Sequence, residues 1–311
     1  MNPLNYLVLF LVFPGFLFSG TMGLLVGWVD RKITARLQWR IGPPWYQNFV
    51  DIMKLFYKET LVPEGASKWV FFSMPLISMA GATLVSTILL VSNGPAHGGF
   101  IGDLIVVVYL LVIPSIALML GGFASGNPLA SLGSSREMKL VLAYELPFLL
   151  ALFVVIMKTG YTIRLGQIIA WQDAHSFVIA SASGAISFFV MIFSIQAKLG
   201  FIPFDMAEAE TEIVSGPYIE YSGRALAMFK IAKAILFFAM PILLITLYLG
   251  GIKFTVDGML WNVLEYLLIL LIVIVIKNTN PRVRIDQAMR FFWRLPTLLA
   301  ILAVVLACLG L

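Results

Sequence analysis

Long apolar runs dominate this sequence and restrict what it can fold into. A helix needs about 20 apolar residues to cross roughly 30 Å of hydrocarbon. Eight segments approach that length, near residues 4–29, 69–92, 102–124, 138–158, 177–197, 225–250, 259–277 and 294–311. Because lipid offers the backbone no hydrogen bonds, each run is expected to be an α-helix. The sequence therefore predicts an all-α integral membrane protein with one membrane domain, residues 1–311, of about eight tilted helices and long cytoplasmic loops.

Composition supports this class and limits the chemistry of the chain. Of the 311 residues 60% are hydrophobic and 12% are charged, and that charged share is about half the value typical of a soluble domain. The one cysteine, Cys308, lies in the last apolar run, so its thiolate alone cannot build an iron–sulfur cluster or a zinc site. His97 and His175 lie in short connections and are interpreted as ordinary loop residues. We expect no catalytic, cofactor-binding or metal-binding residue in this chain.

The basic residues are distributed unevenly between the connections. Those at the odd-numbered connections are sixteen of the 21 in the chain: Arg31, Lys32, Arg36, Arg40, Lys54, Lys58, Lys68, Arg136, Lys139, Lys198, Arg224, Lys277, Arg282, Arg284, Arg290 and Arg294. The even-numbered connections hold only Lys158, Arg164 and Lys253. By the positive-inside rule the odd connections are cytoplasmic, and both termini lie outside the cell membrane. Because the positive charge borders membrane runs, it indicates topology and contact with a lipid bilayer, and no nucleic-acid partner is expected.

Three cytoplasmic connections are long, namely residues 30–68, 198–224 and 278–293. In the first, apolar residues recur at helical spacing between charged ones, which predicts an amphipathic helix at the membrane surface. These apolar residues are Phe49, Ile52, Met53, Phe56 and Tyr57. The helix could be only a membrane-lying anchor. We favour a docking surface for a partner, because the loop carries more basic residues than orientation requires.

Several carboxylates lie in or beside the apolar runs, where an ionisable residue is functional by default. Glu145 and Glu265 lie inside runs, and the acids that precede the sixth run are Asp205, Glu208, Glu210, Glu212 and Glu220. If residues 204–213 form a helix after Pro203, Asp205, Glu208 and Glu212 lie on one face of it. Glu210 then points in another direction. Such a group would titrate as a coupled set.

Other interpretations of these charges remain open. The acidic segment could be a solvated loop, and Asp205 could stabilise a helix N-terminus. Lys230 and Lys233 could be counter-ions of the acids or members of a proton relay. Glu265 could be paired near the outer interface.

Four groups of residues occur in order along nearly the whole chain. They are Asp30-Arg31-Lys32 with Arg40-Ile-Gly42-Pro43 and Asp51-x-x-Lys54; Gly133-Ser134-x-Arg136 with Tyr144-Glu145; Pro203-Phe204-Asp205-x-x-Glu208-Ala209-Glu210-x-Glu212 with Glu220-Tyr221; and Arg282-Val-Arg284-x-Asp286-Gln287. Together they resemble the membrane subunit of respiratory complex I that joins the redox arm to the membrane arm, and its counterparts in energy-converting nickel–iron hydrogenases. The resemblance implies a bundle of tilted helices that forms the floor beneath the redox arm and the start of a carboxylate path into the membrane.

The resemblance and the charge pattern together give two sets of candidate residues. The predicted proton relay comprises Glu145, Asp205, Glu208, Glu210, Glu212, Glu220, Lys230 and Lys233. The predicted redox-arm docking residues are Arg31, Lys32, Arg36, Arg40, Asp51, Lys54, Arg136, Arg282, Arg284 and Asp286. The implied partners are hydrogenase-like large and small subunits, an iron–sulfur subunit and antiporter-like membrane subunits. A nickel–iron centre and iron–sulfur clusters are expected in those partners.

Departures from the family pattern favour one branch. Quinone-reducing members usually have Ala-Glu-x-x-Arg before the Pro-Phe-Asp motif, whereas this chain has Lys198 in place of the acid and Phe201 in place of the arginine. Gly216-Pro217 also resembles the hydrogenase type. We therefore expect a non-catalytic coupling subunit of an energy-converting hydrogenase-like complex, linking electron transfer from ferredoxin to H⁺ or Na⁺ translocation.

Three alternatives remain. The chain could be the quinone-chamber subunit of a true complex I, or belong to a sulfur-reducing relative. A secondary ion transporter would also suit buried charges, but no inverted repeat is visible in the sequence.

The orientation can be tested by labelling. Single cysteines introduced between residues 40 and 60 should react with a membrane-impermeant reagent only from the cytoplasmic side of sealed vesicles, because the basic residues of this loop hold it there. Labelling from the outside would overturn the predicted topology.

Overall fold

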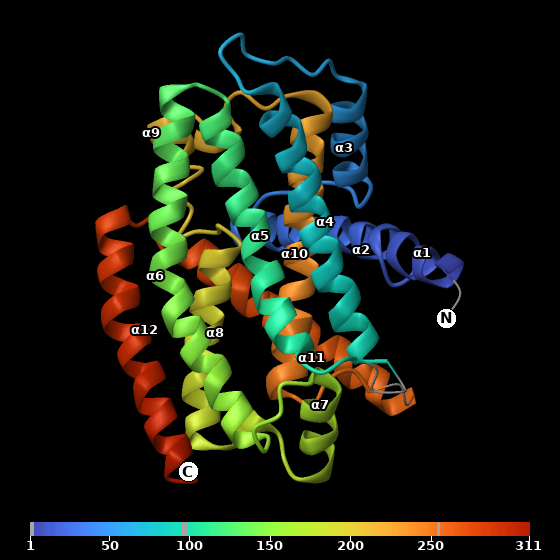
Figure 1. Ribbon diagram of the computed structural model, residues 1–311, viewed down its shortest axis with the longest axis vertical. Helices are drawn as coiled ribbons and strands as arrows, with labels where there is room; N and C mark the ends of the chain where they lie inside the picture. The colour runs from blue at the N-terminus through green and yellow to red at the C-terminus, as the bar shows by residue number, and fades with distance from the viewer. Residues whose placement is uncertain (1–2, 95–98, 254–255) are drawn as a thin grey trace.

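The computed structural model describes residues 3–94, 99–253 and 256–311, and its regular elements in these ranges are helices (Figure 1). The α-helices are α1 (Pro3–Leu11), α2 (Phe16–Leu37), α3 (Gln47–Tyr57), α4 (Lys68–Ser92), α5 (Asp103–Ala124), α6 (Pro128–Lys158), α7 (Leu165–Ala174), α8 (Ala182–Lys198), α9 (Glu210–Ile213), α10 (Gly223–Tyr248), α11 (Val256–Thr279) and α12 (Ile285–Cys308). Two short 3₁₀ helices, η1 (Val178–Ala180) and η2 (Gly216–Tyr218), lie between them. The predicted loop residue His97 lies outside the described residues.

Seven helical segments in the described residues are long and apolar enough to cross a membrane: α2 with the end of α1, α4, α5, α6, α10, α11 and α12. The all-α membrane fold is thereby confirmed. The predicted fifth span is the exception, because α8 has 17 residues and reaches only about 25 Å at 1.5 Å per residue. The predicted amphipathic helix of the first loop is present as α3.

Two helices begin well before the predicted spans that they contain. Helix α6 begins at Pro128, ten residues before the predicted span near 138–158, because proline suits the first helical position and the Asn127 side chain accepts a hydrogen bond from the Leu129 amide at 2.8 Å. The predicted cytoplasmic loop 278–293 is mostly helical, since α12 begins at Ile285. The first part of α12 has charged residues on its exposed face, so its hydropathy is too low to indicate a membrane helix. On its other face, Ala288 and Phe292 are fully buried.

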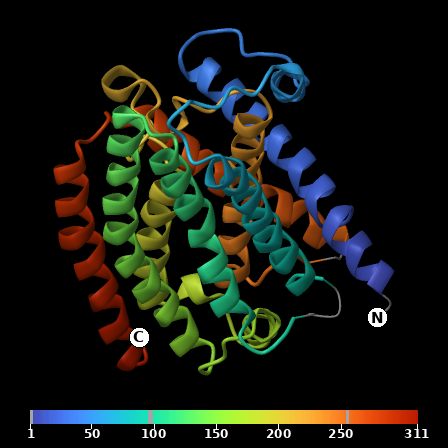
Figure 2. The same cartoon turned by 45° about the horizontal axis from the view of Figure 1, so that its top comes forward.

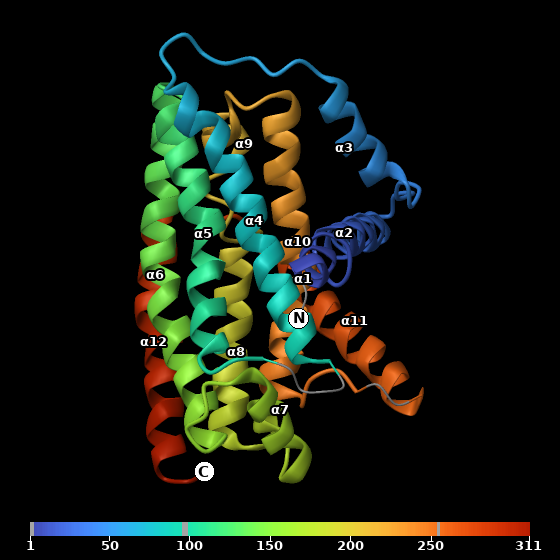
Figure 3. The same ribbon diagram turned by 45° about the vertical axis from the view of Figure 1, so that its right-hand side comes forward.

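Helix α10 forms the centre of the bundle, with nearly all of its side chains buried between α2, α4 and its other neighbours. Helix α12 packs along α6 and α8 on one side, and α2 lies on the opposite side (Figure 2). Helices α2 and α11 splay away from the main bundle (Figure 3). Gly23 allows α2 to cross α10 closely, because a Cβ at that position would lie 2.5 Å from the carbonyl oxygen of Ala234.

Helix α8 stops partway through the bundle, and the chain continues as an irregular segment, residues 199–209, towards α9 (Figure 1). Most of this segment is buried. Irregular backbone at membrane depth is tolerated only where protein surrounds it or where it lines a polar cavity. The Gln196 side chain meets part of this requirement by donating a hydrogen bond to the carbonyl oxygen of Ile202 at 2.7 Å. The end of the molecule that carries α3 and α9 is called the loop-rich end below.

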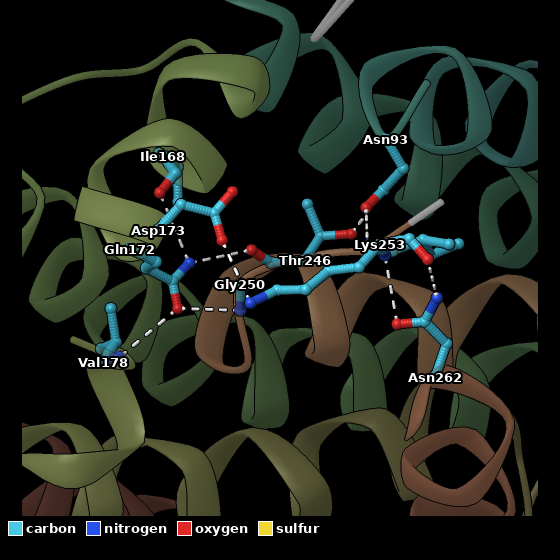
Figure 4. Close-up of polar contacts among 10 residues, drawn as sticks. Asn93, Ile168, Gln172, Asp173, Val178, Thr246, Gly250, Lys253 and Asn262 are labelled. Atoms are coloured by element: carbon cyan, nitrogen blue, oxygen red, sulfur yellow. Dashed lines mark hydrogen bonds and ion pairs between the residues drawn. The ribbon is translucent and has the colours of Figure 1, made fainter. Parts of the chain in front are cut away.

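The opposite end of α10 is held by two buried side-chain amides (Figure 4). Asn93 donates a hydrogen bond to the Thr246 hydroxyl oxygen at 2.7 Å. Gln172 donates to the Thr246 carbonyl oxygen at 3.1 Å and accepts from the Gly250 amide at 3.1 Å. These bonds satisfy groups that a helix C-terminus leaves unpaired. They fix α10 against α4 and α7 at this end.

Candidate functional site

Three ion pairs connect helices in the interior below the loop-rich end. Lys198 of α8 lies 2.7 Å from Glu145 of α6. Lys233 of α10 lies 2.6 Å from Glu208 of the irregular segment. The third pair joins Asp30 of α2 to Lys277 of α11 at 2.7 Å. Burying a charge is tolerated only when it is paired, and each pair here satisfies that condition across two elements.

The Lys198–Glu145 pair is the most deeply buried. The Lys198 side chain is 1% exposed, whereas that of Glu145 is 21% exposed. The ammonium also lies 4.8 Å from the ring centre of Tyr144 and 4.4 Å from that of Phe148, which stabilises a cation further. Tyr144, Glu145 and Phe148 are close on α6 because residues three or four apart share a helix face. The lysine at the end of α8 also suits the negative end of that helix dipole.

Glu137 is a buried carboxylate that the sequence interpretation missed. It lies on α6, eight residues before Glu145, and is 7% exposed. With Glu208, Lys198 and Lys233 it lines one small cavity of about 40 Å³. No cation in the described part of the chain lies within 4.0 Å of its carboxylate. In the sequence, Glu137 directly follows Arg136 of the fourth-helix motif. Because the span was predicted to start near residue 138, Glu137 was interpreted as part of the preceding loop.

The acidic segment does not form the predicted helix over residues 204–213, which is an error. Only Glu210–Ile213 is helical, so these residues do not present a stripe of carboxylates. Three acids instead pair with cations from different elements: Glu208 with Lys233, Glu212 with Arg136 at 2.7 Å, and Asp205 with Arg282 at 3.0 Å. These opposite charges draw the carboxylates apart, which also relieves their mutual repulsion.

The remaining predicted relay residues lie nearer the surface. Glu220 accepts a hydrogen bond from the Asn127 side chain at 2.6 Å, and Glu210 is exposed. Lys230 is exposed and lines two cavities. Glu265, which was not assigned to the relay, lies on α11 and is only partly buried. Their roles remain predictions.

Asp205 combines a buried carboxylate with an incomplete set of partners. Burial raises its pKa above the usual range, and the nearby Arg282 guanidinium offsets only part of this effect. One carboxylate oxygen, Oδ1, is buried without a hydrogen-bond partner among the described residues. Asp205 therefore binds a proton more readily than an exposed aspartate does.

The predicted docking residues lie at the loop-rich end or beside it. Arg31 pairs with Asp51 at 2.8 Å, and both side chains are about half exposed. Burial is the largest single effect on Asp51 and opposes its ionisation, but hydrogen bonds from Arg31 and Gln47, together with the positive charges of Arg31 and Lys230, outweigh it and lower the pKa of this carboxyl. Exposed pairs of this kind contribute little stability, which leaves their charges available to a partner. The other docking candidates that are exposed are Arg36, Arg40, Lys54, Arg282, Arg284 and Asp286, whereas Lys32 and Arg136 are partly exposed.

Lys233 lies where three cavities meet. A cavity of about 500 Å³ between α2, α3 and α10 is lined by Asp30, Lys230 and Lys233 among others. A second cavity of about 430 Å³ is lined by Glu208, Glu210 and the same two lysines. Because Lys233 also lines the small cavity that contains Glu137, it connects the open surface with the buried carboxylates.

Beyond Glu145 the middle parts of the central helices carry no further charged residue. The sequence of α10 from residue 235 to 248, of α6 from 146 to 157 and of α8 from 182 to 197 lacks Asp, Glu, Lys, Arg and His. The same holds for α5 from residue 104 to 124. The middle of each of these helices is therefore uncharged, although Asp103 is buried at the start of α5 and Tyr248 at the end of α10.

Comparisons with known proteins agree with this architecture. The sequence model described as NADH dehydrogenase matches residues 8–308. The H subunit of NADH-quinone oxidoreductase from Anoxybacillus flavithermus is 33% identical over 298 residues, covering 92% of this chain and 86% of the relative. The protein of the same name from Carboxydothermus hydrogenoformans is 30% identical, covering 92% and 83%.

A solved structure is also similar over its whole length. It is a chain of an archaeal respiratory complex, the membrane-bound sulfane sulfur reductase, with a TM-score of 0.86 and 27% identity. The alignment covers 97% of this chain and 99% of that one. Within the residues described here, no group of three or more His, Cys, Asp or Glu side chains is arranged to hold a metal ion.

The Lys198–Glu145 pair gives a stability prediction. Lys198→Met leaves Glu145 without its counter-charge, so the thermal unfolding midpoint of the purified complex should fall, by the equivalent of about 3–5 kcal/mol. The double variant Lys198→Met/Glu145→Gln should recover most of this loss, because no unpaired charge remains. Lys139→Met, at an exposed position of α6, is the matched control. Equal losses in the single and double variants would show that the pair is not the cause.

Proposed function

The chain belongs to the NADH dehydrogenase family of complex I H-type membrane subunits, and we propose that it couples electron transfer in a cytoplasmic redox arm to ion translocation. The observation that carries this proposal is the buried Glu137, which lies without a cation partner in the described ranges between two lysine–carboxylate pairs. The fold alone would not indicate an activity. The function rests on these side chains.

The arrangement suits a relay of protons. Glu208 and Lys233 border the open cavities, Glu137 shares the small cavity with them, and Glu145 with Lys198 lies deepest. When Glu208 takes up a proton, Lys233 loses its counter-charge and its field then favours an ionised Glu137. Groups that interact so closely titrate together. A charge change at the loop-rich end thereby alters the electrostatic potential at Glu145. No side chain has to move across the membrane for this effect.

The path ends in this chain, which distinguishes a coupling subunit from a free-standing transporter. The apolar parts of α5, α6, α8 and α10 carry no charged residue beyond Glu145, and a transporter needs a route to the other side. The Glu145 side chain is 21% exposed. We therefore assign the continuation to a neighbouring antiporter-like membrane protein that contacts α6 near this carboxylate and carries the H⁺ or Na⁺ pathway.

We infer the partners from the resemblance to the hydrogenase branch of the family. The loop-rich end faces the cytoplasm in this proposal, with both termini outside, and binds hydrogenase-like large and small subunits and an iron–sulfur subunit. Those partners contain the nickel–iron centre and the clusters and carry out the redox steps. The exposed charges around Arg31, Lys54 and Arg284 and the exposed aromatic residues Trp39 and Tyr57 form a suitable surface for them. Side chains of this mixed kind are enriched at protein interfaces.

Two residues favour electrons passing from ferredoxin to protons or to a sulfur compound. Lys198 replaces the acid of the quinone-type motif and is fully engaged with Glu145. Phe201 replaces the arginine, and two lysine ammonium groups already lie over its ring. The likeness to the sulfane sulfur reductase supports this branch. Nickel in the purified complex would favour a hydrogenase over a sulfur reductase.

A quinone-chamber function is the second candidate. It is favoured by the relatives named NADH-quinone oxidoreductase and by the cavity of about 500 Å³ between α2, α3 and α10. Reduction of a quinone by the purified complex, at rates matching its main acceptor, would establish it.

The relay is tested by Glu137→Gln and Glu208→Gln in the intact complex, reconstituted in sealed vesicles. Each change keeps the size and most hydrogen bonds while removing the titratable proton. Ions moved per electron pair should fall about tenfold or more, while the complex remains assembled. Glu64→Gln is the matched control, because Glu64 is exposed in the loop before α4 and lines none of the three cavities that meet at Lys233. Full pumping by both variants would reduce these carboxylates to a structural role.

A further inference from the structure

Phe201 lies next to two ammonium groups that belong to different ion pairs. The Nζ atom of Lys277 is 4.9 Å from its ring centre, and that of Lys233 is 5.5 Å away. Lys277 pairs with Asp30 and Lys233 pairs with Glu208. A ring attracts a cation through the negative potential of its face. One aromatic side chain therefore connects two carboxylate–lysine pairs.

The position of this ring is fixed by its surroundings. Phe201 follows Gly200, whose φ of +58° gives the turn that ends α8. The ring packs edge-on against Phe237 of α10, with the ring centres 4.9 Å apart and the planes at 86°. Asp30, Phe201, Lys233 and Phe237 all line the cavity of about 500 Å³. The ring and both pairs are thus held around one space between α2 and α10.

The charges around this ring balance only while both carboxylates are ionised. Two ammonium groups over one ring repel each other, and Glu208 and Asp30 compensate them. Uptake of one proton by Glu208 leaves one excess positive charge beside Lys277 and Asp30. The other charged groups that line this cavity are Arg31, Asp51, Lys54, Lys58 and Lys230. Most of these groups are basic, and the one acid among them, Asp51, is paired with Arg31. Asp30 is therefore the acid best placed to compensate the excess positive charge.

We propose that Phe201 is a positioning residue that couples the Glu208–Lys233 pair to the Asp30–Lys277 pair, which makes Asp30 a further member of the charge relay. This inference rests on the proposed coupling function and extends it. When Glu208 is protonated, Lys233 is released from it and turns over the Phe201 ring towards Asp30. The Asp30–Lys277 contact then loosens. The ring supplies an intermediate position for the ammonium group, which no aliphatic side chain can do.

The consequence is a connection from the relay to the periphery of the molecule. Asp30 belongs to α2 and Lys277 to α11, the two helices that splay from the bundle (Figure 3). Thr34 on α2 accepts a hydrogen bond from Asn278 on α11 at 3.1 Å, which is a second tie between them. Loosening the Asp30–Lys277 pair would allow the ends of α2 and α11 at this site to move against α10. The protonation state of Glu208 is thereby transmitted to the contact between α2 and α11.

The test compares ring-removing and ring-retaining variants of the intact complex in vesicles. Phe201→Leu and Phe201→Met remove the ring and keep an apolar side chain, and they should lower the ions moved per electron pair by about threefold to tenfold. Phe201→Tyr keeps the ring and should retain coupling. Phe189→Leu is the matched control, because it removes a ring of α8 that contacts Phe193 away from this cavity and over which no lysine lies in the described part of the chain.

A double-variant comparison distinguishes coupling from a packing defect. If the ring acts through Asp30, Phe201→Leu/Asp30→Asn should be no more impaired than the worse single variant. Multiplied losses would overturn the inference, as would full coupling in Phe201→Leu. If no ring-removing variant assembles, Asp30→Asn alone decides, since unimpaired pumping by it excludes Asp30 from the relay. Loss of pumping in Glu208→Gln together with normal pumping in Phe201→Leu would refute this inference and leave the proposed function intact.

Discussion

The buried contact between Lys198 and Glu145 is the interaction on which the rest of the interior depends. An ammonium group that is 1% exposed cannot remain charged without a partner, so the end of α8 must face the carboxylate on α6. Helix α8 stops just after this lysine, at the turn made by Gly200 with a φ of +58°, and the following residues run as irregular, mostly buried chain to the loop-rich end. That segment carries Phe201, Asp205 and Glu208 to depths which a continuous helix crossing the whole bundle would not have given them.

The ion pairs below the loop-rich end lie in one half of the bundle, where lysines from α8, α10 and α11 each meet a carboxylate from another element. The other half contains the buried Asp103 and the Asp173–Lys253 pair. There, side-chain amides such as Asn93 and Gln172 hold the end of α10, and its residues 235–248 carry no charge. In the proposed function, such a chain receives a charge change from the redox arm and passes it to ion-translocating partners.

Much of the fold was predictable because hydropathy reports burial in lipid directly. Helices α4, α5 and α10 have long uncharged runs and were found within a few residues. The start of α12 was missed because its exposed face is charged, and Glu137 was missed because the boundary of α6 was placed after it. The helix predicted over residues 204–213 was wrong because the cations that pair with these acids, such as Arg282, come from distant parts of the chain. The Asp30–Lys277 pair spans 247 positions, a separation at which one sequence carries no signal of contact.

The most direct test of the central claim is an infrared difference spectrum of the purified complex, recorded when electrons are supplied to its redox arm. A relay through Glu137 requires this carboxylate to change its protonation state or its hydrogen bonding during turnover. The spectrum of the unmodified complex should then contain a carboxylic-acid carbonyl band that is absent from Glu137→Gln and retained in Glu212→Gln, whose exposed carboxylate pairs with Arg136. Identical carbonyl bands in the unmodified complex and in Glu137→Gln would contradict the relay.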